Sequence, residues 1–333
     1  MKKEFLDILR CPECGKSALR LEDNRILCGE CNVSYEIRDG ILDFLKNPSA
    51  GVKNERAAVD MEEYFQDEKG KRYKIDKDSI QRFREQFLLL PEGDDSVFFR
   101  RGGCFQPIAE ASHRFYGTLE RMELKGGERI LNLGDGFGYA SYKFAKKGCR
   151  VVALDISRYL FAAELYTKYA YFDRIFSDMH CLPFKEGVFD IVFCSAVLHH
   201  SGELNKVFSE IYRVLKKGGR VFIINESSRG IAEKENPNFK NLRERGYGDT
   251  AYTIPQWINA ARKAGFEKIN MEFLSLADDY IRRQENKGAE RKLSLRFAYF
   301  LTRHRGLERF LLFLLKYPRI VLRPRSWRMI CRK

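Results

Sequence analysis

Four cysteines near the start of the chain have the spacing of a metal site. Cys11 and Cys14 form one CxxC pair, Cys28 and Cys31 form a second, and thirteen residues separate the pairs. A gap of two residues lets both thiolates of one tight turn reach the same ion, and two such pairs complete a tetrahedral site that leaves no position for water. The pattern therefore predicts one structural zinc ion bound by Cys11, Cys14, Cys28 and Cys31.

The residues around these cysteines are typical of a zinc ribbon. Gly15 follows the first pair and Gly29 lies within the second, and glycine permits the sharp turns that such pairs need. Between the pairs, residues 18–21 and 25–27 predict the two strands of a hairpin around residues 22–24.

The expected strand 130–133 runs directly into a glycine-rich turn. The sequence across this junction is Asn132-Leu133-Gly134-Asp135-Gly136-Phe137-Gly138. Alternating glycines let the backbone turn sharply and approach a ligand at the start of a helix. Dinucleotide enzymes use the spacing GxGxxG instead, and here Tyr139 and Ser141 stand where a third glycine would be needed. The loop therefore predicts a cofactor site and disfavours a nicotinamide cofactor.

Polar residues also follow the next apolar runs. Asp155 follows segment 151–154, Asp178 comes shortly after segment 174–176, and Ser195 follows segment 188–194. A carboxylate in the place of Asp155 can accept hydrogen bonds from both hydroxyls of a ribose.

These residues must be positioned by an alternation of strands and helices. Strands are expected at 130–133, 151–154, 174–176, 188–194, 220–224 and 268–274, and helices at 139–147, 159–169, 203–215 and 254–264. Nearly continuous apolar strands that alternate with helices predict an α/β fold whose parallel sheet is covered on both faces. Ligands in such folds lie beyond the C-terminal ends of the strands.

The succession of motifs over residues 128–226 resembles the class I S-adenosylmethionine-dependent methyltransferases, in the subgroup that acts on small molecules and lipid quinones. The segments that carry the resemblance are the glycine loop, 152–157, 177–184, 189–200 and 210–220. The resemblance implies a Rossmann-like fold with a seven-stranded, mostly parallel sheet, and it implies S-adenosylmethionine as the cofactor. Because such enzymes commonly end on an antiparallel strand, Trp327–Arg332 is expected to form it.

The resemblance also implies roles for individual residues. Gly134, Gly136 and Gly138 would face the methionine and ribose portion of the cofactor, Asp155 the ribose, Ile156 the adenine ring, Asp178 and the Met179 backbone the adenine edge, and Ser195 the mouth of the site.

Two positions depart from the family pattern. Asn132 stands where the family has an acidic residue, and Asp135 stands where a small residue or cysteine is usual. Asparagine still donates and accepts hydrogen bonds, so both residues are counted here as cofactor-binding. The alternative is a non-catalytic interaction protein that keeps a relic cofactor fold.

The N-terminal segment 3–47 resembles the small zinc-ribbon proteins that activate tRNA and release-factor methyltransferases. Residues 35–42 follow their pattern YPIxDGIP, with Glu36 and Leu42 in place of the two prolines. This resemblance implies a module that packs on a methyltransferase or feeds substrate to it.

Methylation of a hydroxyl group requires a general base, and histidine is the natural candidate. His199 and His200 follow the fourth expected strand, at the end where the acceptor should lie, and they are the candidate catalytic residues. The alternative is that the pair serves packing or capping.

Positive charge is concentrated at the C-terminal end. Of a net charge of +14, the last 45 residues carry +11, with thirteen Lys or Arg against two Glu. This block predicts a polyanionic partner, namely nucleic acid, an anionic membrane surface or a phosphorylated substrate, or else a solvated basic face.

An amphipathic helix is expected within this basic block. One helical face is formed by Leu307, Phe310, Leu311, Leu314 and Leu315, while Arg305, Arg309 and Lys316 lie opposite. Such a helix can lie on an anionic bilayer or dock on the protein's own core.

We expect a zinc ribbon over 1–47, a linker and helical cap over 48–122, and a methyltransferase domain over 123–333 with a basic helical insertion at 278–325. Residues 227–251 form a long glycine-containing stretch that is a candidate lid over the acceptor. The start of the chain carries acidic residues where a signal peptide needs an apolar run, so a cytoplasmic location is expected, with peripheral contact at the inner membrane face.

The leading functional hypothesis is O- or C-methylation of a small-molecule, glycan or lipid-linked acceptor. The alternative is an RNA methyltransferase that grips tRNA or rRNA with its zinc ribbon and basic region. Residues 195–198 lack the Asn-Pro-Pro-Tyr sequence of amino-group methyltransferases, and no Pro-Cys nucleophile of cytosine-carbon methylation occurs there, which disfavours nucleic-acid bases.

Overall fold

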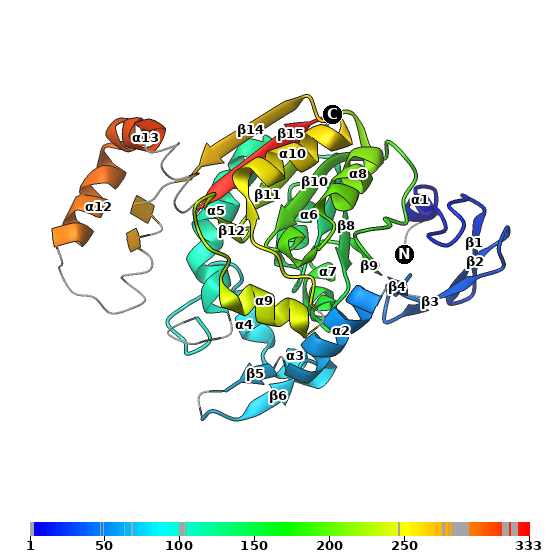
Figure 1. Ribbon diagram of the computed structural model, residues 1–333. Helices are drawn as coiled ribbons and strands as arrows, with labels where there is room; N and C mark the ends of the chain where they lie inside the picture. The colour runs from blue at the N-terminus through cyan, green and yellow to red at the C-terminus, as the bar shows by residue number, and fades with distance from the viewer. Residues whose placement is uncertain are drawn as a thin grey trace.

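The computed structural model describes residues 3–46, 48, 50–62, 64–67, 69–99, 103, 105–245, 247–274, 277–278, 280–281, 293–314, 320 and 326–333. A twisted sheet with helices on both sides forms the body of the molecule (Figure 1).

Seven strands of this sheet form the predicted Rossmann-like core. In spatial order they are β9 (Asp173–Phe176), β8 (Arg150–Asp155), β7 (Arg129–Leu133), β10 (Phe189–Ser195), β11 (Leu215–Ile224), β15 (Trp327–Arg332) and β14 (Lys268–Phe273). Strands β9, β8, β7, β10 and β11 run parallel, and β15 runs antiparallel to both of its neighbours. The predicted strands and the antiparallel last strand are thus confirmed.

Helices bury both faces of the sheet, as continuous apolar strands require. On one side α8 (Leu204–Val214) and α10 (Ile254–Ala264) contribute Phe208 and Trp257 to one buried cluster. On the other side α5 (Gln106–Met122) and α6 (Tyr139–Lys146) contribute Phe115 and Phe144 to a second one.

The helix expected at 159–169 differs from the prediction. It consists of a 3₁₀ turn, Arg158–Ala163, followed by a short α7 (Glu164–Thr167). Ala163 in this turn lies directly against Gly138 of the glycine loop. The close approach of the glycine loop therefore constrains the backbone of the 3₁₀ turn.

The N-terminal ribbon continues the same sheet. It comprises α1 (Lys3–Leu6), β1 (Leu19–Glu22), β2 (Arg25–Cys28), β3 (Ser34–Arg38) and β4 (Ile41–Asp43). Strand β4 pairs in parallel with β9, the edge strand of the core, so the sheet has eleven strands among the described residues instead of the seven expected (Figure 1). The physical reason is that the ribbon's last strand satisfies an otherwise open sheet edge.

Two further contacts hold the ribbon to the core. Leu9, which is fully buried, forms a β-bridge with Phe184, and Arg10 lies 3.3 Å from the carboxylate of Glu210. The ribbon is therefore docked in cis on the domain that follows it.

The segment between ribbon and core is more structured than predicted. It contains α2 (Ala50–Glu62), the hairpin β5 (Tyr64–Gln66) and β6 (Arg72–Lys74), α3 (Lys77–Arg82) and α4 (Arg84–Leu88). The linker expected to begin at residue 48 is already helical from Ala50, while Asn47 and Ser49 lie outside the described residues. Helices α3 and α4 are separated at Phe83.

The candidate lid, residues 227–251, is not a plain loop. Strand β12 (Ser228–Arg229) pairs with β13 (Tyr252–Thr253), and α9 (Pro237–Glu244) lies between them. Asn236 caps α9 by accepting a hydrogen bond from the N–H of Asn238, and Pro237 occupies its first position, which explains why a helix starts there.

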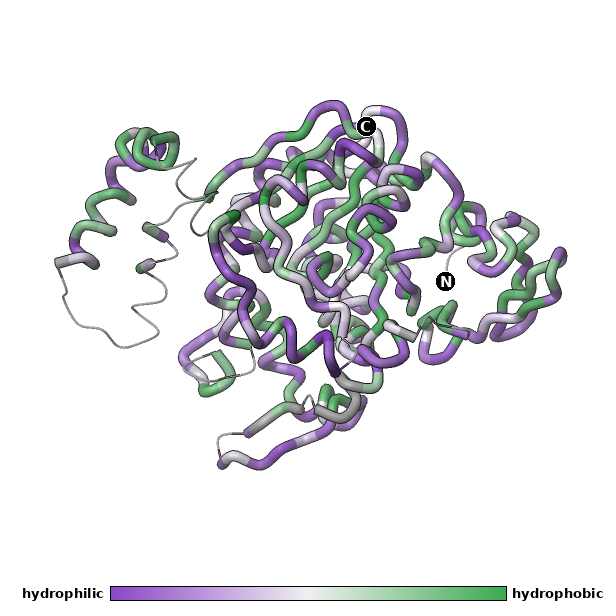
Figure 2. Tube along the Cα trace, in the orientation of Figure 1, coloured by the Kyte–Doolittle hydropathy of each residue, from purple (hydrophilic) through white to green (hydrophobic). Residues whose placement is uncertain are grey.

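The basic insertion contains two helices, α12 (Leu293–Arg303) and α13 (Arg305–Leu314), which stand apart from the body of the molecule (Figure 1). Leu307, Phe310 and Leu314 are 41%, 57% and 52% exposed, so docking of these side chains on the protein's own core is wrong. Figure 2 shows hydrophobic residues interspersed with hydrophilic ones along both helices. The predicted positions Leu315 and Lys316 lie outside the described residues, among which no helix is long and apolar enough to span a bilayer.

Candidate active site and zinc centre

A cavity of about 740 Å³ opens at the C-terminal ends of β7, β8 and β10. Nine of the ten predicted cofactor-binding residues line it, namely Asn132, Gly134, Asp135, Gly136, Asp155, Ile156, Asp178, Met179 and Ser195. The tenth, Gly138, does not line the cavity and packs against Ala163 instead. Residues from four different strand ends thus meet at one place, as the parallel sheet predicts.

The glycine loop is a left-handed turn that only glycine tolerates well. Gly134 and Gly138 have φ of +72° and +92°, and a Cβ there would meet Val197 Cγ2 at 2.2 Å and Ala163 Cβ at 2.5 Å, respectively. Gly136 has φ of +60°, and no heavy atom lies within 4 Å of where its Cβ would stand. Gly134 and Gly138 thus serve packing, whereas Gly136 leaves open backbone at the cavity.

Asp155 connects the glycine loop to the second strand. One carboxylate oxygen accepts the N–H of Gly136 at 2.8 Å, and the other accepts the N–H of Ser157 at 2.8 Å. Burial raises the pKa of Asp155 above its usual range despite these hydrogen bonds. The carboxylate therefore holds the loop, and it keeps lone pairs free for a ligand in the cavity.

Asp178 is held by a histidine that the sequence analysis had not singled out. Its Oδ1 accepts the backbone N–H of His180 at 2.8 Å and lies 2.6 Å from His180 Nδ1, while His180 Nε2 lies 2.7 Å from Ser201 Oγ. Burial alone would raise the pKa of Asp178, but the hydrogen bonds from His180 outweigh burial and lower it. Asp178 is thus ionised and oriented at the cavity wall.

Ser195 is paired with a residue at the end of the next strand. Its Oγ accepts a hydrogen bond of 3.0 Å from Asn225 Nδ2, and Asn225 also lines the cavity. Asn225 has a left-handed φ of +61° directly after β11, a conformation that asparagine tolerates better than most residues.

The two candidate catalytic histidines lie in different surroundings. His199 Nδ1 lies 2.7 Å from Glu226 Oε2, and the buried Glu226 also accepts the backbone N–H groups of Val197, Leu198 and His199. His199 does not line the cavity, whereas His200 does. Glu226 therefore organises the turn that carries both histidines.

His200 sits between two carboxylates from distant parts of the chain. Its Nδ1 lies 3.1 Å from Glu55 of α2 and 3.4 Å from Asp249 of the candidate lid, in ionic contacts rather than aligned hydrogen bonds. Burial alone would lower the pKa of His200, but Asp249 and Glu55 outweigh it and raise the pKa to about 10. At neutral pH this imidazole is a cation.

The candidate lid touches the same turn at several points. Thr250 of the lid donates its backbone N–H to the His199 carbonyl at 2.8 Å, and just beyond the lid the Tyr252 hydroxyl donates to the Ser201 carbonyl at 2.6 Å. Gly248 packs against the His200 carbonyl so closely that a Cβ would stand 1.8 Å from that oxygen. Tyr247 and Gly248 thereby form part of the cavity wall.

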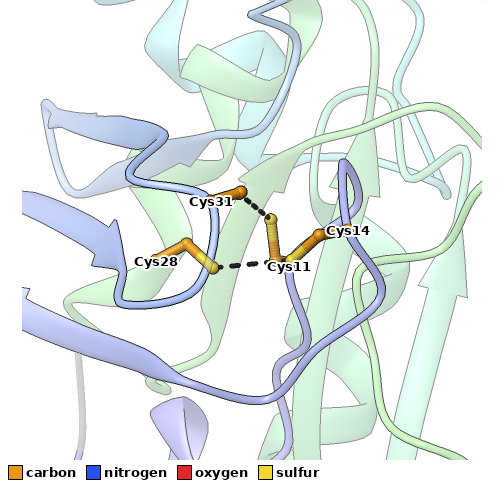
Figure 3. Close-up of side chains that lie close together, drawn as sticks. All are labelled: Cys11, Cys14, Cys28 and Cys31. Atoms are coloured by element: carbon orange, nitrogen blue, oxygen red, sulfur yellow. Dashed lines mark hydrogen bonds between the residues drawn. The ribbon is translucent and has the colours of Figure 1, made fainter.

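The four predicted zinc ligands converge at one point of the ribbon (Figure 3). The sulfurs of Cys11 and Cys31 lie 3.6 Å apart, as do those of Cys14 and Cys28, and all four lie within 4.8 Å of one another. Tetrahedral Zn–S bonds of about 2.3 Å place sulfurs about 3.8 Å apart, so the donors fit the ion. The Tyr35 hydroxyl lies 3.1 Å from Cys11 Sγ and can donate to that thiolate. Zinc itself stays a prediction.

The turns of the two cysteine pairs are built alike but with different residues. Gly15 N–H donates to the Cys11 carbonyl and Asn32 N–H to the Cys28 carbonyl, at 2.8 and 2.9 Å. Gly15 and Asn32 both have a left-handed φ, of +72° and +58°. The glycine expected to permit the second turn, Gly29, does not adopt this conformation; Asn32 does.

Comparison with known proteins agrees with both resemblances. Residues 131–223 match the family model described as a methyltransferase domain, and residues 2–40 match the model described as a Trm112p-like protein. The chain therefore joins a Trm112p-like domain to a class I methyltransferase domain.

Individual relatives are methyltransferases. The chain is 30% identical to a sterol 24-C-methyltransferase of Saccharomyces cerevisiae over 196 residues, which is 55% of this chain and 50% of that protein. It is 34% identical to a demethylmenaquinone methyltransferase of Corynebacterium efficiens over 106 residues, 32% of this chain and 45% of that protein. The chain thus spans about half the length of these curated relatives.

One solved structure illustrates the shared fold. Phosphoethanolamine N-methyltransferase 2 of Haemonchus contortus, in complex with S-adenosylhomocysteine, matches with a TM-score of 0.51 and 22% identity over 83% of this chain and 60% of that one. This likeness concerns the fold alone.

Proposed function

We propose that this protein is an S-adenosylmethionine-dependent methyltransferase that acts on a small-molecule or lipid-linked acceptor at an anionic membrane surface. The observation that carries the proposal is a cavity in which the open backbone of Gly136 lies beside Asp155 and Asp178. An open glycine turn and two oriented acids suit a ligand that combines ribose, adenine and an amino acid.

The residues present divide the work of binding. Asp155 would accept hydrogen bonds from the ribose hydroxyls, Ile156 would pack on the adenine ring, and Asp178 would accept from the adenine amino group. When bound, the cofactor supplies a methyl group on a sulfonium, which the acceptor atom displaces in line, so positioning contributes much of the rate.

The two histidines are proposed to act differently. His200 lines the cavity as a cation, so it can orient or stabilise a negatively polarised acceptor but has no free lone pair with which to accept a proton at neutral pH. His199, paired with Glu226, is proposed to position His200 and the turn that both share. If the acceptor is a hydroxyl group, the general base that removes its proton is then expected to be another group of the acceptor or another residue of the cavity wall.

The membrane part of the proposal rests on α12 and α13. The apolar residues Leu307, Phe310 and Leu314 of α13 are exposed. On α12, Phe297, Tyr299 and Phe300 are 56%, 41% and 45% exposed. Arg296, Arg303 and Arg309 are exposed on the same two helices. An apolar surface flanked by arginines complements the headgroup region of an anionic bilayer, and the names of two relatives refer to lipid acceptors.

A vesicle assay tests this surface. Phe310 and Phe313, which are 57% and 73% exposed, are replaced by serine, and Leu21→Ser, at a 50% exposed position of the ribbon, serves as the matched control. Each phenylalanine removed forfeits about 1.5 kcal/mol or more of burial, so binding to phosphatidylglycerol vesicles should fall at least roughly tenfold. Phosphatidylcholine vesicles should bind weakly throughout. Unchanged binding by the double variant would remove the membrane from the proposal.

The acceptor class is tested by fractionation. Labelled methyl from S-adenosylmethionine should enter the lipid or small-molecule fraction of a cell extract, and the same extract treated with ribonuclease should behave identically. Label recovered in RNA, together with RNA binding that falls steeply with salt, would favour the RNA alternative instead.

A further inference from the structure

The two residues that depart from the family pattern meet in the folded protein. Asn132 Nδ2 donates a hydrogen bond to Asp135 Oδ1 and a second one, of 3.1 Å, to Ser141 Oγ. Both Asn132 and Asp135 line the cavity, and they are 1% and 5% exposed. The acid missing from position 132 is therefore present three residues later, in direct contact with the residue that replaced it.

Asp135 has an oxygen that the protein leaves unused. Its Oδ2 is buried without a hydrogen-bond partner among the described residues. A buried carboxylate oxygen is costly unless a donor or a cation meets it. Burial, together with the nearby charge of Asp155, raises the pKa of Asp135 to about 7 although hydrogen bonding with Ser141 opposes this shift, so the protein compensates the charge of this group only in part. Such a group at a cavity wall is suited to a cationic ligand.

We propose that Asn132 and Asp135 have exchanged roles, so that Asp135 binds the ammonium group of the cofactor's methionine portion and Asn132 holds it in place. The inference rests on the proposed function, because it takes S-adenosylmethionine as the ligand. The glycine loop is expected to face the methionine and ribose portion of the cofactor. The ammonium group of that portion is a hydrogen-bond donor, and we take it, not the sulfur, as the partner of the Asp135 carboxylate. Asn132 supplies no charge but donates to Oδ1, so Oδ2, which is buried without a protein partner, is the oxygen left to accept from the ligand.

Two cofactor analogues separate this contact from the rest of the site. S-adenosylhomocysteine carries the ammonium, whereas 5′-methylthioadenosine shares its adenosine but lacks the amino-acid portion. Calorimetric titration of the zinc-loaded full chain with each analogue compares the wild type with Asp135→Asn, a variant of the same size without the charge. The variant should bind S-adenosylhomocysteine roughly 10- to 100-fold more weakly, the loss expected for a charge-assisted hydrogen bond. Its affinity for 5′-methylthioadenosine should change less than about threefold on the same scale.

The reciprocal double variant is the decisive control. Asn132→Asp combined with Asp135→Asn restores one acid and one amide to the pair, and it should recover most of the lost affinity for S-adenosylhomocysteine. Asn132→Asp alone places two carboxylates in contact and should bind poorly, because like charges at this distance repel. Recovery in the double variant is a result that a merely structural role of Asp135 does not produce.

Several outcomes overturn the inference. Equal losses for both analogues would mean that Asp135 shapes the loop, and an unchanged S-adenosylhomocysteine affinity would mean that it does not touch the ligand. A larger loss for S-adenosylmethionine than for S-adenosylhomocysteine would assign Asp135 to the sulfonium instead. If the wild type binds neither S-adenosylhomocysteine nor S-adenosylmethionine, the proposed function itself fails.

A measurement on the wild type covers the case in which Asp135→Asn does not fold. Protonation of Asp135 should weaken S-adenosylhomocysteine binding as the pH falls below about 7, while 5′-methylthioadenosine should follow a flatter profile. The other titratable groups that face Asp135 are Asp155 of β8, Tyr139 of α6 and Tyr166 of α7. Asp155 affects both analogues alike through the ribose, so their difference isolates Asp135. Parallel profiles would contradict the inference.

Discussion

Replacing Gly136 by alanine should weaken cofactor binding while leaving the fold nearly intact. Gly136 has φ of +60°, and a Cβ there meets no heavy atom of the protein within 4 Å. The cost to the fold is therefore that of one alanine in the left-handed region, about 1–2 kcal/mol. The added methyl group stands at the cavity wall, where the backbone is expected to meet the ligand.

Gly138→Ala is the matched control for this variant. Its φ of +92° carries the same left-handed penalty, and its Cβ would also stand 2.6 Å from the Ala163 Cα. Because a backbone atom cannot rotate away, overpacking adds about 1–3 kcal/mol, for a total of roughly 2–5 kcal/mol. Gly138 does not line the cavity, so the loss here is one of stability.

Guanidinium denaturation and calorimetric titration with S-adenosylhomocysteine distinguish the two effects. Gly136→Ala should lose at least roughly tenfold in affinity, about 1.4 kcal/mol, and only the roughly 1–2 kcal/mol of stability that the left-handed conformation costs. Gly138→Ala should be clearly less stable than Gly136→Ala. Wild-type affinity in Gly136→Ala would refute the close approach of the loop to the ligand, and equal stability of the two variants would refute the packing of Gly138 on Ala163.

Three further predictions concern the ribbon and the histidine at the cavity. Leu9→Ala should cost about 2–5 kcal/mol in guanidinium denaturation, since Leu9 is fully buried where the ribbon meets the core, whereas Leu21→Ala at an exposed position should cost almost nothing. Chelation of the predicted single zinc ion should make the ribbon protease-sensitive, as should Cys31→Ser; a ribbon that resists protease without metal would refute a structural role for zinc. The pKa of His200 is raised to about 10, so it stabilises the fold fully below its usual pKa near 6.5 and loses this effect as the pH rises through 10. The difference in unfolding free energy between wild type and His200→Gln should therefore shrink between pH 6 and pH 10, and a constant difference would contradict the ion pairs.

The core strands could be predicted because each carries its own signal. A strand buried on both faces must be apolar along its buried length, and Val151–Leu154 and Ile191–Cys194 show this directly. The pairing of β4 with β9 could not be predicted, because Ile41–Asp43 contains nothing that specifies a partner more than a hundred residues away. The polar sequence of α2 likewise hides a helix whose Val52 and Glu55 line the cavity.

The convergence of the candidate cofactor-binding residues was predictable for a similar reason. Asp155 and Ser195 each come at the end of a strand, and strand ends in a parallel sheet converge. Glu226 could have been found by the same rule, since it follows the strand that ends at Ile224. Glu55 and Asp249 could not, because only the folded chain brings these two carboxylates to His200.

The most direct test of the central claim is transfer of labelled methyl from S-adenosylmethionine to a cell extract by the purified, zinc-loaded protein, with Asp155→Ala as the control. We expect label in the lipid or small-molecule fraction with the wild type and a loss of at least roughly tenfold with the variant, which lacks the carboxylate that holds the loop and is proposed to bind the ribose. Absence of transfer to any fraction, together with no binding of S-adenosylhomocysteine, would contradict the account and leave an interaction protein with a relic cofactor fold.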